Sequence, residues 1–537
     1  MFFTRSRALH SSRISDKATS DIEDSIRLCS ANFPHLLGVI GISTPSYDRA
    51  DVRPGVVNIG LRNFHRVHNA VFFDSLLRLP GNKSWGMISV AMNERQRRAC
   101  NELKVQDSLY TVVAKNGQGL SDLRVIGSIL DVMQAPDDCL SVSDLISKNE
   151  TRMVTLTIKE SKYHFDRDFQ KLDETHPDIV YDLLSGTFSR PFRTPAGLLV
   201  SGLYQRYLNK GHPITILSCD NLIRNGEMTR KMVETFALHK FPLKPGFHRW
   251  LSANVFYPNT MCDRICLTDP SGDRIGLQQE FGVRDNALLT TESHNEWVIE
   301  KWMGNKPEGL EEVGIKMVPS TIPYENLKVR LNYGCRLCVA MVASAMGIPD
   351  FEAAMQRSHL SSFADSYMNE VSNALGDTPK GMDLDAYKRN VKVRIATPQL
   401  KYSTARVVED ASKKIVVDWK PILESLVPTG KTSPSIAFAL SAWIHLLGGS
   451  SIVNPQQSNI SIPDCDMHIL DSASKKIIGS VDHVSENIPV NEFLHLVFGP
   501  ESHFVPLLGE SIVHALKDIN KLGIEGSLKK RQSESQF

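Results

Sequence analysis

The sequence predicts an α/β domain with a largely parallel sheet, followed by a second domain that is mainly helical. Between residue 53 and about residue 290, short β-branched runs typical of strands alternate with amphipathic stretches typical of helices. Beyond about residue 323, strand signals become rare and helical periodicity dominates. The alternating part indicates parallel strands joined by helices, and the later part indicates helices packed on one another.

The predicted strands of the first domain are short and rich in valine and isoleucine. In chain order they are VVNIG (56–60), GMISVAM (86–92), SLYTVVA (108–114), LRVIGSI (123–129), MVTLTI (153–158) and ITILSCDN (214–221). The polar, amphipathic stretch from Asn93 to Lys104 predicts a helix after the second strand. This order of elements is the one expected of an open sheet covered by helices.

Helical periodicity marks the second domain, which we expect to span residues 323–525. It is clearest in residues 340–347, 351–356, 383–394 and 511–522. Apolar runs such as 436–447 are shorter than the roughly 20 residues that cross a bilayer, so we interpret them as buried helices. No membrane anchor is therefore expected.

The charge and cysteine content argue against several classes of partner. The 537 residues carry a net charge of +1 with a pI of about 7.6, so nothing attracts nucleic acid or an anionic membrane to the chain as a whole. Small molecules are the expected partners. Nine cysteines in so long a chain are unlike a secreted disulfide framework, which favours a reducing, cytoplasmic location.

Both ends of the chain differ in composition from its body. The first residues, MFFTRSRALHSSRIS, contain three arginines and several serines, with no acid before Asp16. That composition occurs in transit peptides for mitochondria or plastids and also in disordered extensions. We therefore expect residues 1–52 to be an N-terminal extension of one of these two kinds. The polar residues 526–537 are expected to form a solvated tail.

A strand-to-helix turn is predicted in IGLRNFHRVH, residues 59–68. A dinucleotide-binding turn usually has a second glycine two residues after the first, which lets the backbone lie against a pyrophosphate. Gly60 supplies the first glycine, but Arg62 occupies the second place. Its side chain would crowd a pyrophosphate if it pointed inward, and would clamp phosphate oxygens if it pointed outward. By itself the turn is a weak signal.

Further blocks follow in order along the chain: SCDNLIRNG (218–226), FYPNTMCDRI (256–265), EWVIEKW (296–302), PYENLKVRLNYG (323–334) and RVVEDASKK (406–414). From about residue 53 to 525 the chain strongly resembles the long-chain polyol dehydrogenases, the family of mannitol dehydrogenase and fructuronate reductase. The resemblance implies a zinc-independent, NAD(P)-dependent oxidoreductase that interconverts a sugar alcohol and its 2-keto sugar, or a hexuronate and its ketose acid. It also implies a monomer, with the cofactor on a Rossmann-like domain, residues 53–322, and the substrate in a cleft below the helical domain.

The resemblance also assigns roles to particular residues. Lys328 matches the family's general base, and Glu325 matches a glutamate that relays protons between that lysine and water. Alcohol oxidation leaves a proton on oxygen, and a desolvated lysine whose pKa is lowered toward neutrality can accept it. The places that bind substrate hydroxyls in the family are matched by Asn221, Asp263, Arg406 and Lys414.

The sequence departs from the family's pattern just after Lys328. Family members have an asparagine and a histidine there that polarise the carbonyl, but this chain has Tyr333 and Arg336, which we assign to substrate binding and to catalysis. On an α-helix Asn332 would face the same side as Lys328, so its amide is a candidate substitute. Arg336 could stabilise negative charge, but it would also disfavour protonation of Lys328. A catalytically degenerate binding or regulatory protein is therefore the rival interpretation.

The same resemblance identifies candidate cofactor contacts. Those nearest the phosphates would be Gly60, Phe64, His65 and Arg66. The adenosine ribose is expected at the end of GMISVAMNE, where Glu94 slightly favours NAD. The neighbouring Arg95 and Arg97 would equally accept the additional phosphate of NADP.

Two close cysteine pairs, in CDRIC and CRLC, could in principle provide four zinc ligands. They are Cys262 with Cys266 and Cys335 with Cys338. Both pairs lie within blocks assigned to substrate binding or catalysis, and neither lies on a typical zinc-binding turn. We interpret them as buried small residues and expect no metal site.

Overall fold

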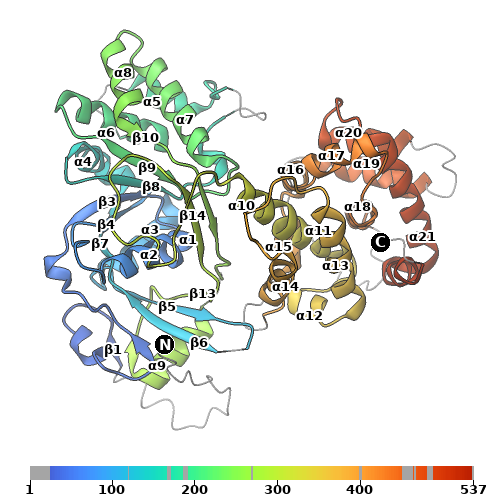
Figure 1. Cartoon of the computed structure of the whole chain (residues 1–537), viewed down its shortest axis with the longest axis horizontal. Coiled ribbons are helices and arrows are strands. Elements are labelled where there is room, and N and C mark those ends of the chain that lie inside the picture. The colour runs from blue at the N-terminus through green and yellow to red at the C-terminus, as the bar shows by residue number, and fades with distance from the viewer. Residues whose placement is uncertain are drawn as a thin grey trace. The chain divides into compact units, whose positions relative to one another are not determined.

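The chain consists of two compact units, Met1–Ile322 and Pro323–Phe537, shown in Figure 1. The computed structural model describes residues 25–118, 120–165, 171–185, 191–267, 270–397, 402–449, 464, 467–480 and 488–534. The first unit is built around parallel strands and the second is helical. The predicted fold class is confirmed.

Six parallel strands form the main sheet of the first unit. Across the sheet they are β7 (Ile129–Gln134), β4 (Gly86–Ala91), β3 (Pro54–Ile59), β8 (Met153–Leu156), β9 (Ile214–Ser218) and β10 (Val255–Phe256). The chain starts at the centre with β3, builds outward to β7, and returns to the centre with β8. This is the strand order of a Rossmann fold, which binds its ligand where the order reverses, between β3 and β8.

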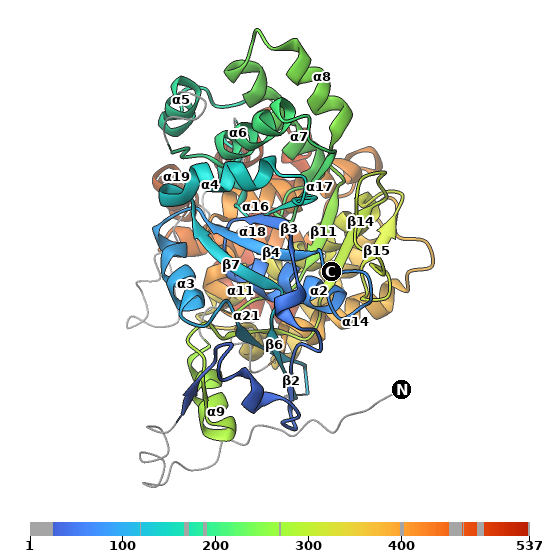
Figure 2. The same cartoon turned by 90° about the vertical axis from the view of Figure 1, so that its left-hand side faces the viewer.

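Each face of this sheet packs against its own set of helices, because successive side chains of a strand point to opposite faces. Val57 and Ile59 pack with one set, whereas Val56 packs with the other. The first set is α4 (Ala135–Ser147), α5 (Pro177–Leu184), α6 (Pro195–Leu208), α7 (Asn225–Lys240) and α8 (Pro245–Asn254). The second set is α1 (Asn63–Val67), α2 (Asn69–Leu76) and α3 (Glu94–Lys104). Figure 2 shows α3 and α4 on opposite sides of β7.

Two of the predicted strands belong to a different sheet. β5 (Tyr110–Lys115) and β6 (Ser121–Ile126) pair antiparallel, and they lie between β13 (Leu289–Glu292) and β2 (Ile42–Ser43). The connection between β5 and β6, residues 116–120, is too short for the crossover that parallel strands require. A third sheet consists of β11 (Thr260–Asp263), β14 (Glu296–Glu300) and β15 (Lys316–Val318).

The segment from residue 25 to 52 is folded onto the first unit, which differs from the expected extension. β1 (Ile26–Arg27) pairs with β12 (Val283–Arg284), and β2 pairs with β6. Leu28 and Leu36 are buried in a small hydrophobic cluster together with Leu123. Apolar side chains therefore hold this segment in place. The arginine-rich start, interpreted as a transit peptide or a disordered extension, lies outside the described residues.

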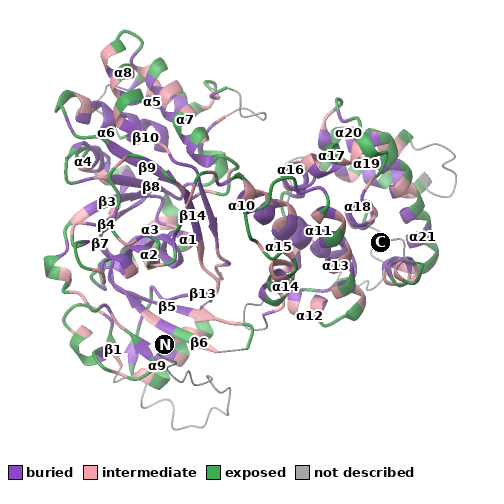
Figure 3. Cartoon of the chain, viewed as in Figure 1, coloured by how far each residue is buried: buried purple, intermediate pink, exposed green. Residues whose placement is uncertain are grey.

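The second unit is a set of helices around one hydrophobic core. They are α10 (Ile322–Asn326), a π-helix (Leu327–Tyr333), α11 (Gly334–Ala345), α12 (Phe351–Met355), α13 (Ser358–Ser372), α14 (Leu384–Ile395), α15 (Thr404–Val408), α16 (Ala411–Asp418), α17 (Lys420–Leu426), α18 (Pro434–Leu447), α19 (Met467–Ser480), α20 (Ile488–Phe498) and α21 (Val505–Ser533). α11 and α18 are buried along nearly their whole length, as Figure 3 shows. Within the described part of the chain, no helix has the length and apolar character that crossing a membrane requires.

The end of the chain is helical and packed, unlike the solvated tail expected for residues 526–537. α21 continues past a kink at Gly523, where φ is +71°, and ends at Ser533. Leu528 is fully buried, and the side-chain amide of Gln532 donates a hydrogen bond to the carbonyl of His359 at 2.6 Å. The apolar residues beyond the kink thus complete the core. Residues 535–537 lie outside the described residues.

We predict that Leu528→Ala lowers the free energy of unfolding of the helical unit by about 2–5 kcal/mol, since it leaves a cavity in the core. Leu522 lies before the kink with half of its surface exposed, so Leu522→Ala should change that free energy by less than about 0.5 kcal/mol. Urea unfolding of both variants measures the difference. Equal stability of the two would show that the end of α21 does not belong to the core.

Candidate functional site

The turn after β3 has room only for glycine. Gly60 has a φ of +102°, and a Cβ atom there would lie 2.3 Å from the carbonyl oxygen of Thr157, just beyond β8. The Gly60 carbonyl accepts hydrogen bonds from the side-chain amide of Asn58 at 3.0 Å and from the Thr157 hydroxyl at 2.5 Å. The ends of β3 and β8 are thereby held together at the point where the strand order reverses, which is where a Rossmann fold binds its ligand.

Arg62 fits this turn without strain. It is the N-cap residue of α1, with extended backbone angles of −100° and 161° that any residue adopts, and it is half-buried. Its backbone amide donates to the carbonyl of Gly60 at 2.8 Å. The second glycine of the usual motif is therefore not required by the backbone here.

Asp220 connects the ends of two neighbouring strands. It follows β9, and its carboxylate accepts hydrogen bonds from the amides of Ile158 at 3.1 Å and Lys159 at 2.8 Å, just beyond β8. The Tyr163 hydroxyl donates to the same carboxylate at 3.1 Å. Burial raises the pKa of Asp220, although these hydrogen bonds and the charge of Arg62 oppose the rise. The predicted substrate residue Asn221 comes next and is exposed.

Two of the predicted phosphate contacts have side chains directed into the domain. The His65 imidazole Nε2 lies 2.8 Å from the Ser89 hydroxyl, and burial lowers the pKa of His65 to about 3. The buried guanidinium of Arg66 donates to the carbonyl of Ala287 at 3.0 Å. Phe64 is only half-buried and stacks on another ring of the same segment. His65 and Arg66 therefore hold α1 in place, and only their backbone is available to a cofactor.

Glu94 is exposed at the start of α3, just beyond β4. Its carboxylate accepts a hydrogen bond from the Arg97 guanidinium at 2.7 Å, and Arg97 also pairs with Asp137 at 3.0 Å. The Asn93 side chain caps the helix by accepting from the amide of Gln96. The acid expected to favour NAD and the cation expected to accept the NADP phosphate are thus paired with each other.

Lys328 lies in the π-helix that joins α10 to α11. In a π-helix the backbone hydrogen bonds join residues five apart, and Tyr333, five residues after Lys328, has its ring centroid 5.1 Å from the Lys328 ammonium. Asn332, the candidate selected from α-helical spacing, is also buried in this π-helical segment. Lys328 and Glu325 are both buried, with 6% of their surface exposed. Short π-helical segments occur frequently at functional sites.

The two residues that depart from the family's pattern contact each other. The Arg336 guanidinium lies 4.3 Å from the centroid of the Tyr333 ring and donates to the Tyr402 hydroxyl at 3.3 Å. Arg336 is 5% exposed. The Tyr333 ring therefore contacts two cations, Lys328 and Arg336, through cation–π interactions. This arrangement places a permanent positive charge close to the candidate base.

The predicted pair Arg406 and Lys414 comes from adjacent short helices. Arg406 is exposed on α15, whereas the Lys414 ammonium donates to the carbonyls of Val407 at 2.8 Å and Glu409 at 2.6 Å. Burial lowers the pKa of Lys414. Lys414 thus stabilises the C-terminal end of α15, the helix that carries Arg406.

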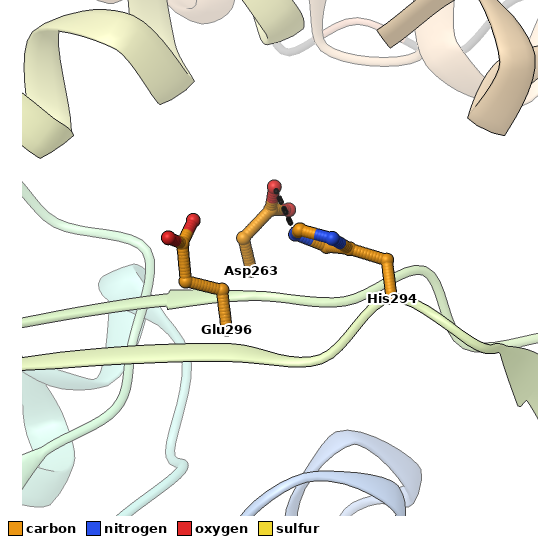
Figure 4. A group of neighbouring side chains, drawn as sticks. All are labelled: Asp263, His294 and Glu296. Carbon is orange, nitrogen blue, oxygen red and sulfur yellow. Dashed lines mark ion pairs between the residues drawn. The ribbon is translucent and has the colours of Figure 1, made fainter. Parts of the chain in front are cut away.

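Asp263 lies in a cluster that the sequence analysis did not identify as a whole. It is directly opposite Glu296 on the antiparallel pair β11 and β14, and His294 precedes β14 on the same face, as Figure 4 shows. The His294 Nε2 is 3.6 Å from the Asp263 carboxylate, and the ligand atoms of all three residues lie within 4.8 Å of one another. The alternate spacing of His294 and Glu296 is the signal that could have revealed the cluster.

The cluster of Asp263, His294 and Glu296 offers two carboxylates and an imidazole, a set that can hold a cation or accept hydrogen bonds from hydroxyl groups. The Lys316 ammonium forms an ion pair with Glu296, so one carboxylate already has a positive partner. Of the four cysteines considered as zinc ligands, Cys262, Cys335 and Cys338 are buried, as predicted, and Cys266 is partly exposed.

The fold and these positions define a class: a Rossmann domain followed by a helical domain that begins with a buried lysine. Comparison with known families agrees with this class. Residues 54–310 match the mannitol dehydrogenase Rossmann domain, and residues 321–518 match the mannitol dehydrogenase C-terminal domain. The chain belongs to the mannitol dehydrogenase family.

Similar proteins include mannitol 2-dehydrogenases of fungi. That of Emericella nidulans is 32% identical over 431 residues, which cover 79% of this chain and 85% of the relative. That of Aspergillus oryzae is 31% identical over 77% of this chain and 82% of the relative.

Two solved structures share the whole architecture. The Pseudomonas fluorescens mannitol 2-dehydrogenase ternary complex with NAD and D-mannitol has a TM-score of 0.82 and 27% identity, covering 95% of this chain and 100% of that one. A D-sorbitol dehydrogenase in substrate-free form shares the fold, with a TM-score of 0.79 and 24% identity over 94% of this chain and 100% of that one.

We predict that His65 makes the protein sensitive to acid. Its pKa is depressed in the folded state, so its contribution to stability is present above the ordinary value of about 6.5 and is lost as the pH falls toward 3. Between pH 6.5 and pH 5 the loss should be about 2 kcal/mol. Urea unfolding of His65→Gln should show a weaker pH dependence across this range.

The matched control for this experiment is His35→Gln, because His35 is exposed. This variant should keep the pH dependence of the parent. If His65→Gln and the parent lose stability in parallel on acidification, the buried imidazole is not the source of the acid sensitivity.

Proposed function

We propose that this protein is an NAD(P)-dependent oxidoreductase that interconverts a sugar alcohol and its 2-keto sugar. The observation that carries the proposal is the buried Lys328 at the start of the helical domain of a mannitol dehydrogenase family member. Relatives named mannitol 2-dehydrogenase, and a related structure that contains NAD and D-mannitol, support a polyol of this kind as the substrate.

The first domain fits a dinucleotide cofactor. Gly60 allows the close approach of backbone that a pyrophosphate requires, and the turn lies where the strand order reverses. Gly60, Arg62 and the backbone of α1 would hold the phosphates, and Glu94 would contact the adenosine ribose. When bound, the nicotinamide would supply the acceptor or donor of hydride. We propose NAD as the slightly better cofactor, because Glu94 is the more exposed partner of its pair with Arg97.

Lys328 is the proposed general base. In the oxidation direction its neutral Nζ accepts the proton of the substrate hydroxyl, and in reduction the protonated Nζ returns a proton to the carbonyl oxygen. Its burial keeps water from competing for that proton. Glu325 precedes Lys328 by three residues and is also buried, and we propose that it passes the proton on toward solvent.

Substrate hydroxyls require fixed donors and acceptors. We propose that Asn221 and Asp263 bind them from the first domain and Arg406 from the second. The Asp263 carboxylate is buried at the end of β11, where the low dielectric strengthens the hydrogen bonds that it accepts. Lys414 acts on the substrate through Arg406, since its ammonium is occupied by the carbonyls at the end of α15.

Arg336 and Tyr333 influence which reaction is favoured. A guanidinium donates hydrogen bonds that can stabilise negative charge on a reacting oxygen, which supports Arg336 as the polarising residue with Asn332 beside it. The same charge would also attract a carboxylate, so a hexuronate reductase is the alternative activity. The tight contact of Tyr333 with both cations favours the second alternative, a catalytically degenerate protein that binds a ligand.

We predict that the purified protein oxidises NADH or NADPH with at least one of fructose, xylulose, ribulose, fructuronate and tagaturonate. A spectrophotometric screen at 340 nm measures this. Turnover should be unchanged after dialysis against EDTA, because the proposed chemistry uses a lysine and no zinc. Loss of turnover on chelation, restored by Zn²⁺, would instead support a metal at Asp263, His294 and Glu296.

We predict that Lys328→Ala lowers turnover by about 100-fold or more, because acid–base catalysis is lost. Alcohol oxidation by the parent should accelerate as the pH rises, since the base acts in its neutral form, and ketone reduction should show the opposite trend. NADH affinity and the circular dichroism spectrum should be retained. The control is Lys413→Ala, which removes an exposed lysine of α16 and should leave turnover intact.

An active parent whose turnover is indifferent to Lys328→Ala would contradict the assigned base. A parent that binds a nucleotide or sugar and shows no turnover with any pair of cofactor and ketose in the screen would favour the degenerate alternative.

A further inference from the structure

Lys159 has a backbone conformation that normally requires glycine. It follows β8, and its φ is +91° with a ψ of 142°. Side chains other than glycine are strained in this region, and residues held there occur preferentially at ligand sites. Lys159 is exposed, so packing of its side chain does not explain why this conformation is kept.

The conformation is imposed by Asp220. Its carboxylate accepts hydrogen bonds from the amides of both Ile158 and Lys159, at 3.1 and 2.8 Å, and it is itself fixed by the Tyr163 hydroxyl at 3.1 Å. The backbone at Lys159 is therefore held from β9, independently of what its side chain contacts. The backbone position from which the Lys159 side chain extends is therefore fixed.

Lys159 lies beside the dinucleotide-type turn. Thr157, two residues earlier, is the residue whose carbonyl oxygen fills the space next to Gly60. Arg62 belongs to the same turn, and its charge acts on Asp220. The Asp220 carboxylate, which binds the backbone amide of Lys159 and is influenced by the charge of Arg62, thus links these two residues where β3 and β8 end. Neither Arg62 nor Lys159 forms an ion pair with any of the residues described in the structure.

The helix after this turn offers little positive charge to a phosphate. α1 spans only Asn63–Val67, and the chain breaks from helical geometry at His68, where φ is −114° and ψ is −81°. The dipole of so short a helix is small, because it sums over few peptide units. A pyrophosphate bound here needs compensation from side-chain cations.

We propose that Lys159 is a cofactor-binding residue whose ammonium, together with the Arg62 guanidinium, binds the pyrophosphate of the dinucleotide. The inference rests on the proposed binding of NAD or NADP by the first domain. It also explains how a turn with Arg62 in place of the second glycine can bind a pyrophosphate. The positive charges of the two side chains replace the close backbone contact that glycine would allow.

The test compares the parent with Lys159→Gly and Lys159→Arg in binding NADH and ADP-ribose. Fluorescence titration and calorimetry measure the affinities at several salt concentrations. Lys159→Gly should bind both compounds about 10- to 100-fold more weakly, because a charge-assisted hydrogen bond is lost. Its affinity should also fall less steeply with salt than that of the parent. Lys159→Arg should stay within about threefold of the parent, since it keeps the charge.

Folding is monitored separately by thermal unfolding. Lys159→Gly should unfold at the same or a higher temperature than the parent, because glycine relieves the strained backbone. The matched control is Lys162→Ala, which removes a neighbouring exposed lysine and should leave both affinities within about twofold of the parent.

Binding by Lys159→Gly that equals the parent in affinity and in salt dependence would overturn the inference. A parent that binds neither NADH nor ADP-ribose would contradict the proposed function itself, and this inference with it. The two failures are distinguishable, because the first requires a parent that binds.

Discussion

The candidate site depends on the contact between the turn after β3 and the end of β8. The Thr157 carbonyl oxygen occupies the space where a side chain at position 60 would lie, so the two strands can end together only if that residue is glycine. Asp220 extends the arrangement to β9 by binding the amides that follow Thr157. The C-terminal ends of three neighbouring strands, β3, β8 and β9, are therefore held together. Close packing at Gly60 joins the first two, and the hydrogen bonds of the Asp220 carboxylate join the last two.

Local patterns in the sequence were sufficient for the fold class and for four strands of the main sheet, but not for β7 and β10. Runs of valine and isoleucine identified β3, β4, β8 and β9, because strands buried on both faces need such residues. The pattern did not reveal that β5 and β6 form another sheet, which depends on the length of their connection. Nor did it reveal the packing of Leu528, since the polar residues around it resemble a tail.

The candidate site was only partly accessible from the sequence, because side-chain direction depends on tertiary contacts. His65 and Arg66 follow the turn in sequence, yet both are directed inward to Ser89 and Ala287. The sequence also did not indicate that Lys328 lies in a π-helix, because no residue type in that segment is specific to one. Each domain contains a cluster that the motifs did not predict: Tyr333 between two cations, and His294 beside Asp263. In both clusters, residues that were not paired from the sequence contact one another in the structure.

The packing of α21 has a consequence for the order in which the two domains fold during synthesis. The first domain has all of its strands by Val318, so it can fold while synthesis continues. The helical domain is completed later, because Leu528 and Arg531, in the last part of α21, are buried in it. The two domains thus mature at different times, and the one that carries Lys328 acquires its complete core only after α21 has been synthesised.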